Sequence, residues 1–190
     1  MQATNVLWII ALALAAVLAC GCTSPAEEPA ANQTNETPTI ENLSIAEVLD
    51  RDGNFTIFLM AFETARLTRT VDGQGPYTVF APTDEAFGRF PDAVMDGLFN
   101  DPKGTLAEIV LYHMAPGRFT ASDLAANASI ATVQGSPAVI GVADGEVTVG
   151  DATVVRADIP AANGIVHVVD RVMLPPDVTL PPEPAENATA

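Results

Sequence analysis

The spacing of the apolar residues changes at Pro116–Gly117, and this change constrains the fold more than any other feature. Before it, apolar residues recur at helical spacing; after it, they form short runs typical of strands. Helices are predicted over 45–52, Phe55–Leu67, from Thr83 onward, Ala93–Phe99 and 106–114, and strands over Tyr77–Phe80, both halves of Val139–Val149, Ala152–Ile159 and Gly164–Leu174. Helices followed by antiparallel strands predict an α+β fold.

Short polar signals mark where these elements begin and turn. Ser44–Glu47 and Thr105–Glu108 each fit the S/T-x-x-E pattern of a helix capping box. Asp144–Gly145 lies between two apolar-rich runs and predicts a hairpin turn, while Asn163–Gly164 predicts a tight turn before the last strand. Asp170–Arg171, at the end of that strand, is expected to form a structural ion pair.

The charge of the chain argues against nucleic-acid binding. Of 190 residues, 24 are acidic and 8 are Lys or Arg, which gives a formal net charge of −16. Such a surface repels DNA, RNA and anionic lipid headgroups. Cysteine is confined to Cys20 and Cys22, so the rest of the chain has no thiol for a disulfide, a nucleophile or a zinc site.

The first 22 residues are typical of an export signal. The run from Val6 to Leu18 is apolar throughout and is shorter than the roughly 20 residues that span a bilayer. "LACGCTSP" follows and resembles a lipobox, with Cys22 the favoured lipidation site and Cys20 the alternative. No Lys or Arg precedes the run, so an uncleaved N-terminal anchor and simple secretion stay open. Lipidation or an anchor would hold the protein on the outer face of the cell membrane.

Composition divides the remaining chain into three parts. Residues 23–41 are rich in Pro, Thr, Asn and Glu and predict a disordered stalk, and residues 176–190 predict a disordered, proline-rich tail. The folded domain is expected over 42–175. N-x-Ser/Thr sequons make glycosylation of an exported chain plausible, at Asn32, Asn35, Asn42, Asn54, Asn127 and Asn187.

The stretch "YTVFAPTDEAF", Tyr77 to Phe87, contains the two carboxylates that most resemble a catalytic pair. Thr83 is a good helix N-cap, and Asp84 and Glu85 fall in the first helical turn, where acids interact favourably with the helix dipole. Adjacent helical residues point about 100° apart, so the two carboxylates do not face one another. The stretch therefore predicts a strand-to-helix joint, and we expect no enzymatic activity.

Three segments together resemble the fasciclin family. "YTVFAPTDEAF" resembles its first signature box, "NGIVHVVDRVMLP", Asn163–Pro175, resembles the second, and "EIVLYHMAPG", Glu108–Gly117, is similar to the Tyr-His segment between them. The resemblance spans nearly all of the predicted domain. It implies a compact β-wedge or sandwich with helices packed at one side, and a role in cell adhesion.

The resemblance also implies a candidate interaction site. In animal members the Tyr-His segment has been linked to integrin-dependent adhesion, which corresponds here to Val110, Leu111, Tyr112, His113 and Met114. A histidine at a helix end can instead bond to terminal carbonyls, and His167, inside a strand, is expected to be structural or exposed. With these two histidines and no EF-hand loop, no metal or cofactor is expected.

The expected function is thus a membrane-tethered extracellular adhesion module. Its partner would be a cell-surface or matrix protein, a glycan, or a second copy of itself. The alternative is a carrier of a small apolar ligand, a lipid or pigment, held in a groove between the helices and the sheet. An enzyme acting on envelope glycans is the weakest candidate, because no two carboxylates are placed to face each other across a cleft.

Overall fold

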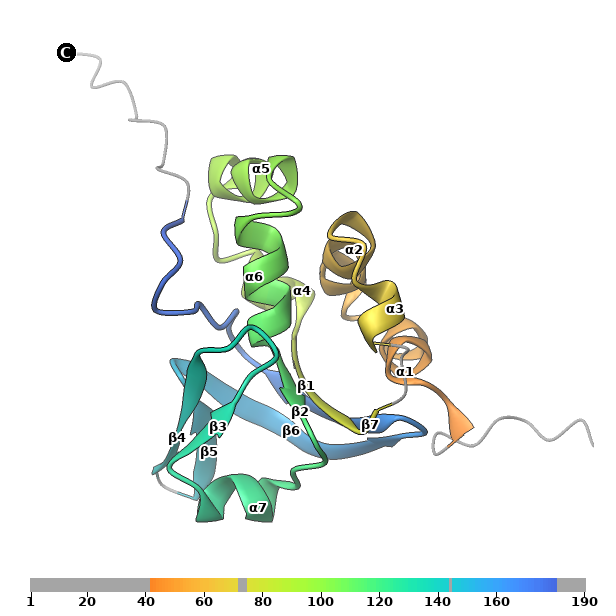
Figure 1. Ribbon diagram of the computed structural model, residues 1–190, viewed down its shortest axis with the longest axis vertical. Coiled ribbons are helices and arrows are strands. Elements are labelled where there is room, and N and C mark those ends of the chain that lie inside the picture. The colour runs from red at the N-terminus through yellow and green to blue at the C-terminus, as the bar shows by residue number, and fades with distance from the viewer. Residues whose placement is uncertain (1–41, 72–74, 144, 181–190) are drawn as a thin grey trace, which may run out of the picture. The chain divides into compact units, whose positions relative to one another are not determined.

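The computed structural model describes residues 42–71, 75–143 and 145–180 (Figure 1). The helices are α1 (Ile45–Asp52), α2 (Thr56–Thr64), α3 (Thr68–Val71), α4 (Asp84–Phe87), α5 (Asp92–Asn100), α6 (Thr105–Tyr112) and α7 (Ala121–Ala126). The strands are β1 (Tyr77–Pro82), β2 (Met114–Pro116), β3 (Ser129–Ala131), β4 (Pro137–Ala143), β5 (Glu146–Val149), β6 (Ala152–Ala161) and β7 (Gly164–Val169). Helices dominate the first half and strands the second, so the predicted α+β class is confirmed.

The described strands form one seven-stranded sheet in the order β2-β1-β7-β6-β5-β4-β3. Neighbours are antiparallel except β1 and β7, which run parallel with Tyr77 opposite Gly164. The sheet curls until its two edges approach each other. There the backbone N–H of Val133, just after β3, donates to the carbonyl of Met114 in β2 over 2.7 Å.

Strands β1 and β7 are neighbouring interior strands of the sheet and are covered on both faces, which explains their almost continuous apolar sequence. Side chains of β7 alternate between two cores. Val166 and Val168 face the helices, while His167 and Val169 face the interior of the curled sheet. Figure 1 shows α1 to α6 together on one side of β1 and β7, and α7 at the opposite end of the curled sheet.

The two cores are distinct groups of buried side chains. The helix-side core includes Leu49, Phe58, Phe62, Leu98, Ile109, Val166 and Val168. The sheet-interior core includes Phe80, Tyr112, Leu124, Ile140, Val149, Val169 and Met173.

One of the two predicted capping boxes is present and the other was wrong. At α1 the Ser44 hydroxyl accepts from Glu47 N, and the Glu47 carboxylate accepts from Ser44 N over 2.7 Å. At α6 the N-cap position is Gly104, and Thr105 is already helical. The carboxylate of Asp101 accepts from the backbone N–H groups of Gly104 and Thr105 instead, at 3.2 and 3.1 Å. Asp101, upstream of α6, thus takes the capping role that was predicted for Thr105.

Several element boundaries also differ from the sequence prediction. The first strand continues past Phe80 to Pro82, because a proline at the last position loses only a terminal ladder bond. The last strand ends at Val169 rather than Leu174. The hairpin around Gly145 forms as predicted, with Ala143 opposite Glu146. The spacing of apolar residues did not reveal α3, α7, β2 or β3, which are too short to show a period.

Candidate functional site

Asp84, in the first signature stretch, caps a helix other than its own. Its carboxylate accepts from the backbone N–H groups of Ile57 and Thr56, at 2.9 and 3.2 Å, at the start of α2. The N-cap residue of α2 is Phe55, which makes no side-chain cap, so Asp84 supplies the acceptor from 27 to 28 residues away. The sequence predicted a local role for this acid and missed its long-range target.

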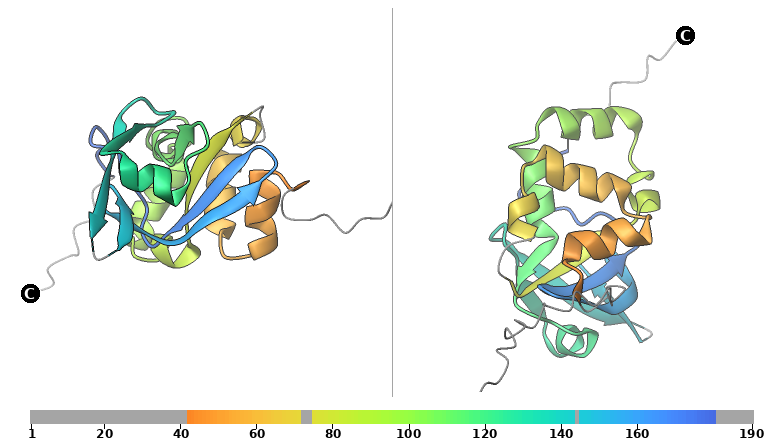
Figure 2. Two further views of the ribbon diagram at one scale, coloured as in Figure 1. Left: turned by 90° about the horizontal axis from the view of Figure 1, so that it is seen from below. Right: turned by 90° about the vertical axis from the view of Figure 1, so that its right-hand side faces the viewer.

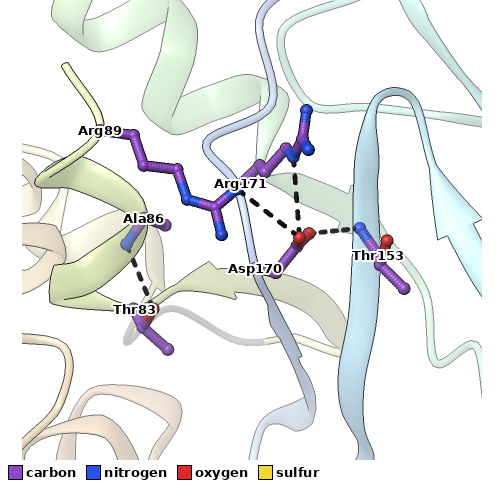
Figure 3. Close-up of polar contacts among 6 residues, drawn as sticks. All are labelled: Thr83, Ala86, Arg89, Thr153, Asp170 and Arg171. Carbon is purple, nitrogen blue, oxygen red and sulfur yellow. Dashed lines mark hydrogen bonds and ion pairs between the residues drawn. The ribbon is translucent and has the colours of Figure 1, made fainter.

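Thr83 has the local role that the sequence predicted. Its side chain accepts from Ala86 N over 3.3 Å and caps α4 (Figure 3). The stretch is therefore a joint that fixes two helix starts at once.

The Tyr-His segment lies at the end of α6 and is largely buried. Val110, Tyr112, His113 and Met114 are at most 5% exposed, and only Leu111 is partly exposed. The Tyr112 hydroxyl donates to the carbonyl of Pro137 over 3.4 Å, and burial raises the pKa of this phenol. An interaction site at this segment stays a prediction, to which the folded chain offers Leu111 as the accessible side chain.

Both ring nitrogens of His113 are engaged inside the protein. Nδ1 lies 2.7 Å from the carbonyl of Ile109, and Nε2 accepts from the backbone N–H of Met173 over 3.0 Å. Because Nε2 must accept, Nδ1 carries the proton and donates. Complete burial lowers the pKa of His113 to about 4, so the ring is neutral at pH 7. The ring also packs on Phe58, at 5.5 Å between centroids.

His167 holds a second set of segments together. Its Nε2 lies 2.8 Å from the carbonyl of Phe119, and Nδ1 accepts from the backbone N–H of Asp158 over 3.3 Å. The ring stacks on Phe80 with centroids 5.6 Å apart. Burial lowers its pKa, partly offset by the hydrogen bond to Phe119 and by the nearby Asp158 carboxylate. The structural role predicted for His167 is confirmed, and the alternative of an exposed ring was wrong.

Asn163 and Gly164 form the predicted turn between β6 and β7. The Asn163 side chain also accepts from Ile45 N over 2.9 Å and donates to the carbonyl of Val71 over 2.6 Å. A Cβ atom at Gly164 would overlap the carbonyl oxygen of Tyr77, so the parallel pairing requires glycine here. The turn signal was readable in the sequence, whereas the contacts of its amide were not.

Asp170 is the centre of a small ionic cluster at the end of β7. Its carboxylate accepts from Thr153 N over 2.7 Å and lies 3.7 Å from Arg171 and 3.9 Å from Arg89 (Figure 3). The Asp170–Arg171 pair predicted from the sequence is present. Both arginine side chains are more than half exposed, so the pairs add little stability.

The remaining candidate residues are placed as follows. Asn42, Asn54 and Asn127 are exposed, while Cys20, Cys22, Asn32, Asn35 and Asn187 lie outside the described residues. Across 42–71, 75–143 and 145–180, no group of three or more His, Cys, Asp or Glu side chains is arranged to hold a metal. Within those same ranges, no helix has the length and apolar character needed to span a bilayer.

Fold and site together define a class of protein: an α+β module whose buried polar side chains hold distant segments in place. The Fasciclin domain profile matches residues 53–175. The chain belongs to the fasciclin family, and the family resemblance of the sequence is confirmed.

Relatives share much of the chain's length. Protein sll1483 of Synechocystis sp. is 36% identical over 143 residues, covering 75% of this chain and 79% of that protein. The cell surface glycolipoprotein MPB83 of Mycobacterium bovis is 32% identical over 154 residues, covering 80% of this chain and 62% of that protein. A FAS1 domain pair from the insect cell adhesion molecule Fasciclin I superposes with a TM-score of 0.58 at 16% identity, over 70% of this chain and 51% of that one, which shows the fold.

Proposed function

We propose that this protein is an exported adhesion module, tethered to the outer face of the cell membrane, that contacts a cell-surface protein, a matrix protein or a glycan. The observation that carries the proposal is the relationship to MPB83, which is named a cell surface glycolipoprotein. That relationship covers 80% of this chain, so it extends beyond the fasciclin match at 53–175. It supports a common layout in which the domain continues into flanking sequence.

The tether is proposed at Cys22, with Cys20 as the alternative. Each buried CH₂ of a lipid chain contributes about 0.8 kcal/mol, so two acyl chains hold a small domain stably at a bilayer. Residues 23–41 would then act as a stalk, 42–175 as the displayed domain and 176–190 as a free tail. Exposed Asn42, Asn54 and Asn127 are accessible to a glycosylating host.

The tether is tested in native cells that express the full chain. We expect radiolabelled fatty acid to be incorporated into the wild type and into Cys20→Ser, and to be lost from Cys22→Ser, which should leave the membrane fraction. Label lost only from Cys20→Ser would move the site to Cys20. Label absent from all three, with the protein still in the membrane, would establish an uncleaved anchor.

Adhesion is tested with the same cells. Deleting the protein should reduce attachment to native cell surfaces or matrix, and re-expression should restore it. Leu111→Asp is the variant that addresses the Tyr-His segment, because Leu111 is its accessible side chain. Normal attachment by folded, surface-displayed Leu111→Asp would remove this segment from the interaction site, whereas normal attachment by the deletion strain would contradict the proposed function.

A second function, carriage of a small apolar ligand, has one observation in its favour. An open groove of about 470 Å³ lies between α1, α2 and α3, and Leu49, Leu59, Met60, Phe62 and Val71 form its apolar part. Lipid or colour that co-purifies with native protein, and that is lost on Leu59→Asp, would support this role. Native material that contains no such ligand would remove it.

A further inference from the structure

The groove between α1, α2 and α3 is built from one face of each of two neighbouring helices. The right view of Figure 2 looks onto this side of the domain, with α1 and α2 next to each other and α3 at one end of them. Residues that line the groove recur every three or four positions: Ala46, Leu49, Asp50 and Gly53 from α1 and its cap, and Thr56, Leu59, Met60 and Glu63 from α2. A continuous face of each helix is therefore turned towards the groove.

The floor of this groove is apolar and partly accessible to solvent. Leu49, Phe62 and Val71 are buried, whereas Leu59 is partly exposed and Met60 is 51% exposed. Neighbouring apolar side chains that stay accessible mark surfaces that bind a partner, and a flexible methionine adapts to the shape of what it contacts. The floor can therefore accept apolar side chains from another molecule.

The charges along the groove are all of one sign. Its described lining residues include Glu47, Asp50 and Glu63 but no Lys or Arg. Two other grooves on the domain differ in this respect, because Arg156 lines both of them together with acids. The α1–α3 groove thus combines an apolar floor with a negative rim, which favours a positively charged occupant.

Two of these acids, Asp50 and Glu63, have no structural role that explains their positions. Each lies in the last turn of its helix, where the negative end of the helix dipole disfavours an acid. Within 42–71, 75–143 and 145–180, neither carboxylate makes an ion pair or a hydrogen bond. Glu47, in contrast, caps α1. Residues that break a local rule without a compensating contact are expected at functional sites.

Shape and charge together select the kind of occupant. An uncharged lipid or pigment would contact the floor but would leave the acids without partners. A second copy of this strongly acidic chain would be repelled by the rim. A helix that presents apolar side chains flanked by Lys or Arg satisfies both parts, and packing an amphipathic helix into a groove between helices is a common mode of recognition.

We propose that the α1–α3 groove is an adhesion contact of this domain and that it receives a basic amphipathic helix of a partner protein. The inference rests on the proposed adhesion function and names the place of the contact and the chemistry of the partner. Apolar side chains of the partner pack on Leu59 and Met60, and its Lys or Arg side chains pair with Asp50 and Glu63.

The size of the groove limits the length of the helix that it can hold. The two helices that form its walls, α1 and α2, have 8 and 9 residues. At a rise of about 1.5 Å per residue they are about 12–14 Å long, so the groove covers roughly two and a half turns of a bound helix. A contact of this size is weak by itself, and many tethered copies on one membrane would add their contacts.

The test measures the binding of a synthetic peptide to the full chain in a phosphatidylcholine nanodisc, with the empty nanodisc as the blank. The probe is a fluorescent amphipathic peptide of Leu and Lys, about 14 residues long so that it can form a helix. We expect saturable one-to-one binding that weakens about tenfold between about 0.05 M and about 0.5 M NaCl, because salt screens the pairs between Lys and the acids. No saturable binding above the blank would overturn the inference.

Two further peptides separate the apolar part of the contact from the electrostatic part. Replacing every Lys by Glu keeps the apolar face and should weaken binding about tenfold or more, because the rim then repels the peptide. Replacing every Leu by Ala keeps the charge and the helix, and should weaken binding by a similar factor. Equal binding of the Glu peptide would indicate an uncharged apolar occupant, and equal binding of the Ala peptide would indicate general attraction to an acidic surface. Either result would overturn the inference.

A pair of double variants locates the electrostatic part of the contact. Asp50→Asn with Glu63→Gln should weaken binding of the Leu and Lys peptide about tenfold. Asp96→Asn with Glu108→Gln removes the same charge from exposed positions on α5 and α6 and should bind as the wild type does. Neutralising acids in a last helical turn should leave the melting temperature unchanged or raise it, so the loss of binding is not a loss of fold. Equal binding by the two double variants would overturn the assignment of the groove.

A second pair of variants tests the floor, and the attachment assay links the groove to adhesion. Met60→Ser should weaken binding of the same peptide about fivefold, whereas Val139→Ser, at a position on β4 that is 63% exposed, should not. Cells that carry Asp50→Asn with Glu63→Gln should attach less than wild-type cells. If these cells attach normally while the deletion strain does not, the adhesion function stands and the inference about the groove fails.

Discussion

Each of the two cores of this domain has one buried histidine beside it. The two histidines differ in how easily water can reach their hydrogen-bond partners. His113 joins α6 to the segment after β7 and contacts the helix-side core through Phe58. His167 joins β7 to the loop before α7 and to β6, and stacks on Phe80 of the sheet-interior core. Each ring donates to a backbone carbonyl and accepts from a backbone N–H.

The difference lies in what replaces the histidine bonds when they break. The Met173 N–H that His113 accepts is buried, whereas Phe119 is half-buried and Asp158 is exposed. Water can therefore reach the partners of His167 more easily than those of His113. Two side chains with the same number of hydrogen bonds can therefore contribute differently to stability, because the free-energy cost of losing a bond depends on whether water can replace it.

The largest effect is expected from His113→Ala. The substitution leaves a cavity and an unsatisfied buried N–H at Met173, which together should lower the free energy of unfolding by about 4 kcal/mol. Chemical denaturation monitored by circular dichroism measures this. His167→Ala is the matched control, and an equal loss in both variants would contradict the ranking of the two sites.

Acid should destabilise the protein next most strongly, through His113. The folded-state pKa is about 4 against an ordinary value of 6.5, so between these values the unfolded chain binds more protons. Stability is therefore full above pH 6.5 and falls as the pH drops towards 4, by about 3 kcal/mol. Urea denaturation at pH 7 and pH 4.5 measures the fall.

Two variants test whether His113 causes this acid destabilisation. His113→Gln should lose most of the pH dependence between 7 and 4.5, whereas His167→Gln should retain the part due to His113. If the slope is the same in wild type and His113→Gln, the carboxylates rather than His113 cause the acid destabilisation.

His167→Leu should have a smaller effect, of about 2 kcal/mol, because the leucine fills the space beside Phe80 and water can reach the partners on the surface. Hydrogen exchange should show faster exchange at Asp158, whose N–H loses its acceptor. Unchanged exchange at that amide would show that the 3.3 Å bond is not made in solution.

The smallest of the four effects is expected at Asp84. Asp84→Ala removes the acceptor from the start of α2 and should cost about 1 kcal/mol. Thr83→Ala, which uncaps α4 instead, is its matched control. Exchange should accelerate at Ile57 in the first variant and at Ala86 in the second, and the reverse pattern would contradict the assignments.

Much of the fold was readable from local patterns, because those patterns reflect local chemistry. Ser44 signalled the start of α1, Thr83 the start of α4, and Asp144–Gly145 the β4–β5 hairpin. Each signal depends on atoms a few residues apart. The capping box predicted at Thr105 is absent because another nearby acceptor, the Asp101 carboxylate, accepts from the first backbone N–H groups of α6 instead.

The candidate site was less predictable, because its contacts join distant segments. Nothing near Asp84 in the sequence indicates that it caps α2, and nothing near His113 indicates that Met173 is its partner. Burial of the Tyr-His segment likewise follows from its place between the two cores, because Val110 and Met114 pack in the helix-side core and Tyr112 in the sheet-interior core. The sequence showed which residues were polar in apolar surroundings, but the identity of their partners required the fold.

The parallel pairing of β1 with β7 has a consequence for how this protein is made. Tyr77 pairs with Gly164, far along the chain, and β7, whose side chains enter both cores, is the last strand of the residues that the structure describes. Neither core can close until β7 has been synthesised, and pairings between such distant segments form slowly. A chain whose cores stay open until β7 emerges remains unfolded while it is made, which is the state that passage through an export channel, as in the proposed function, would require.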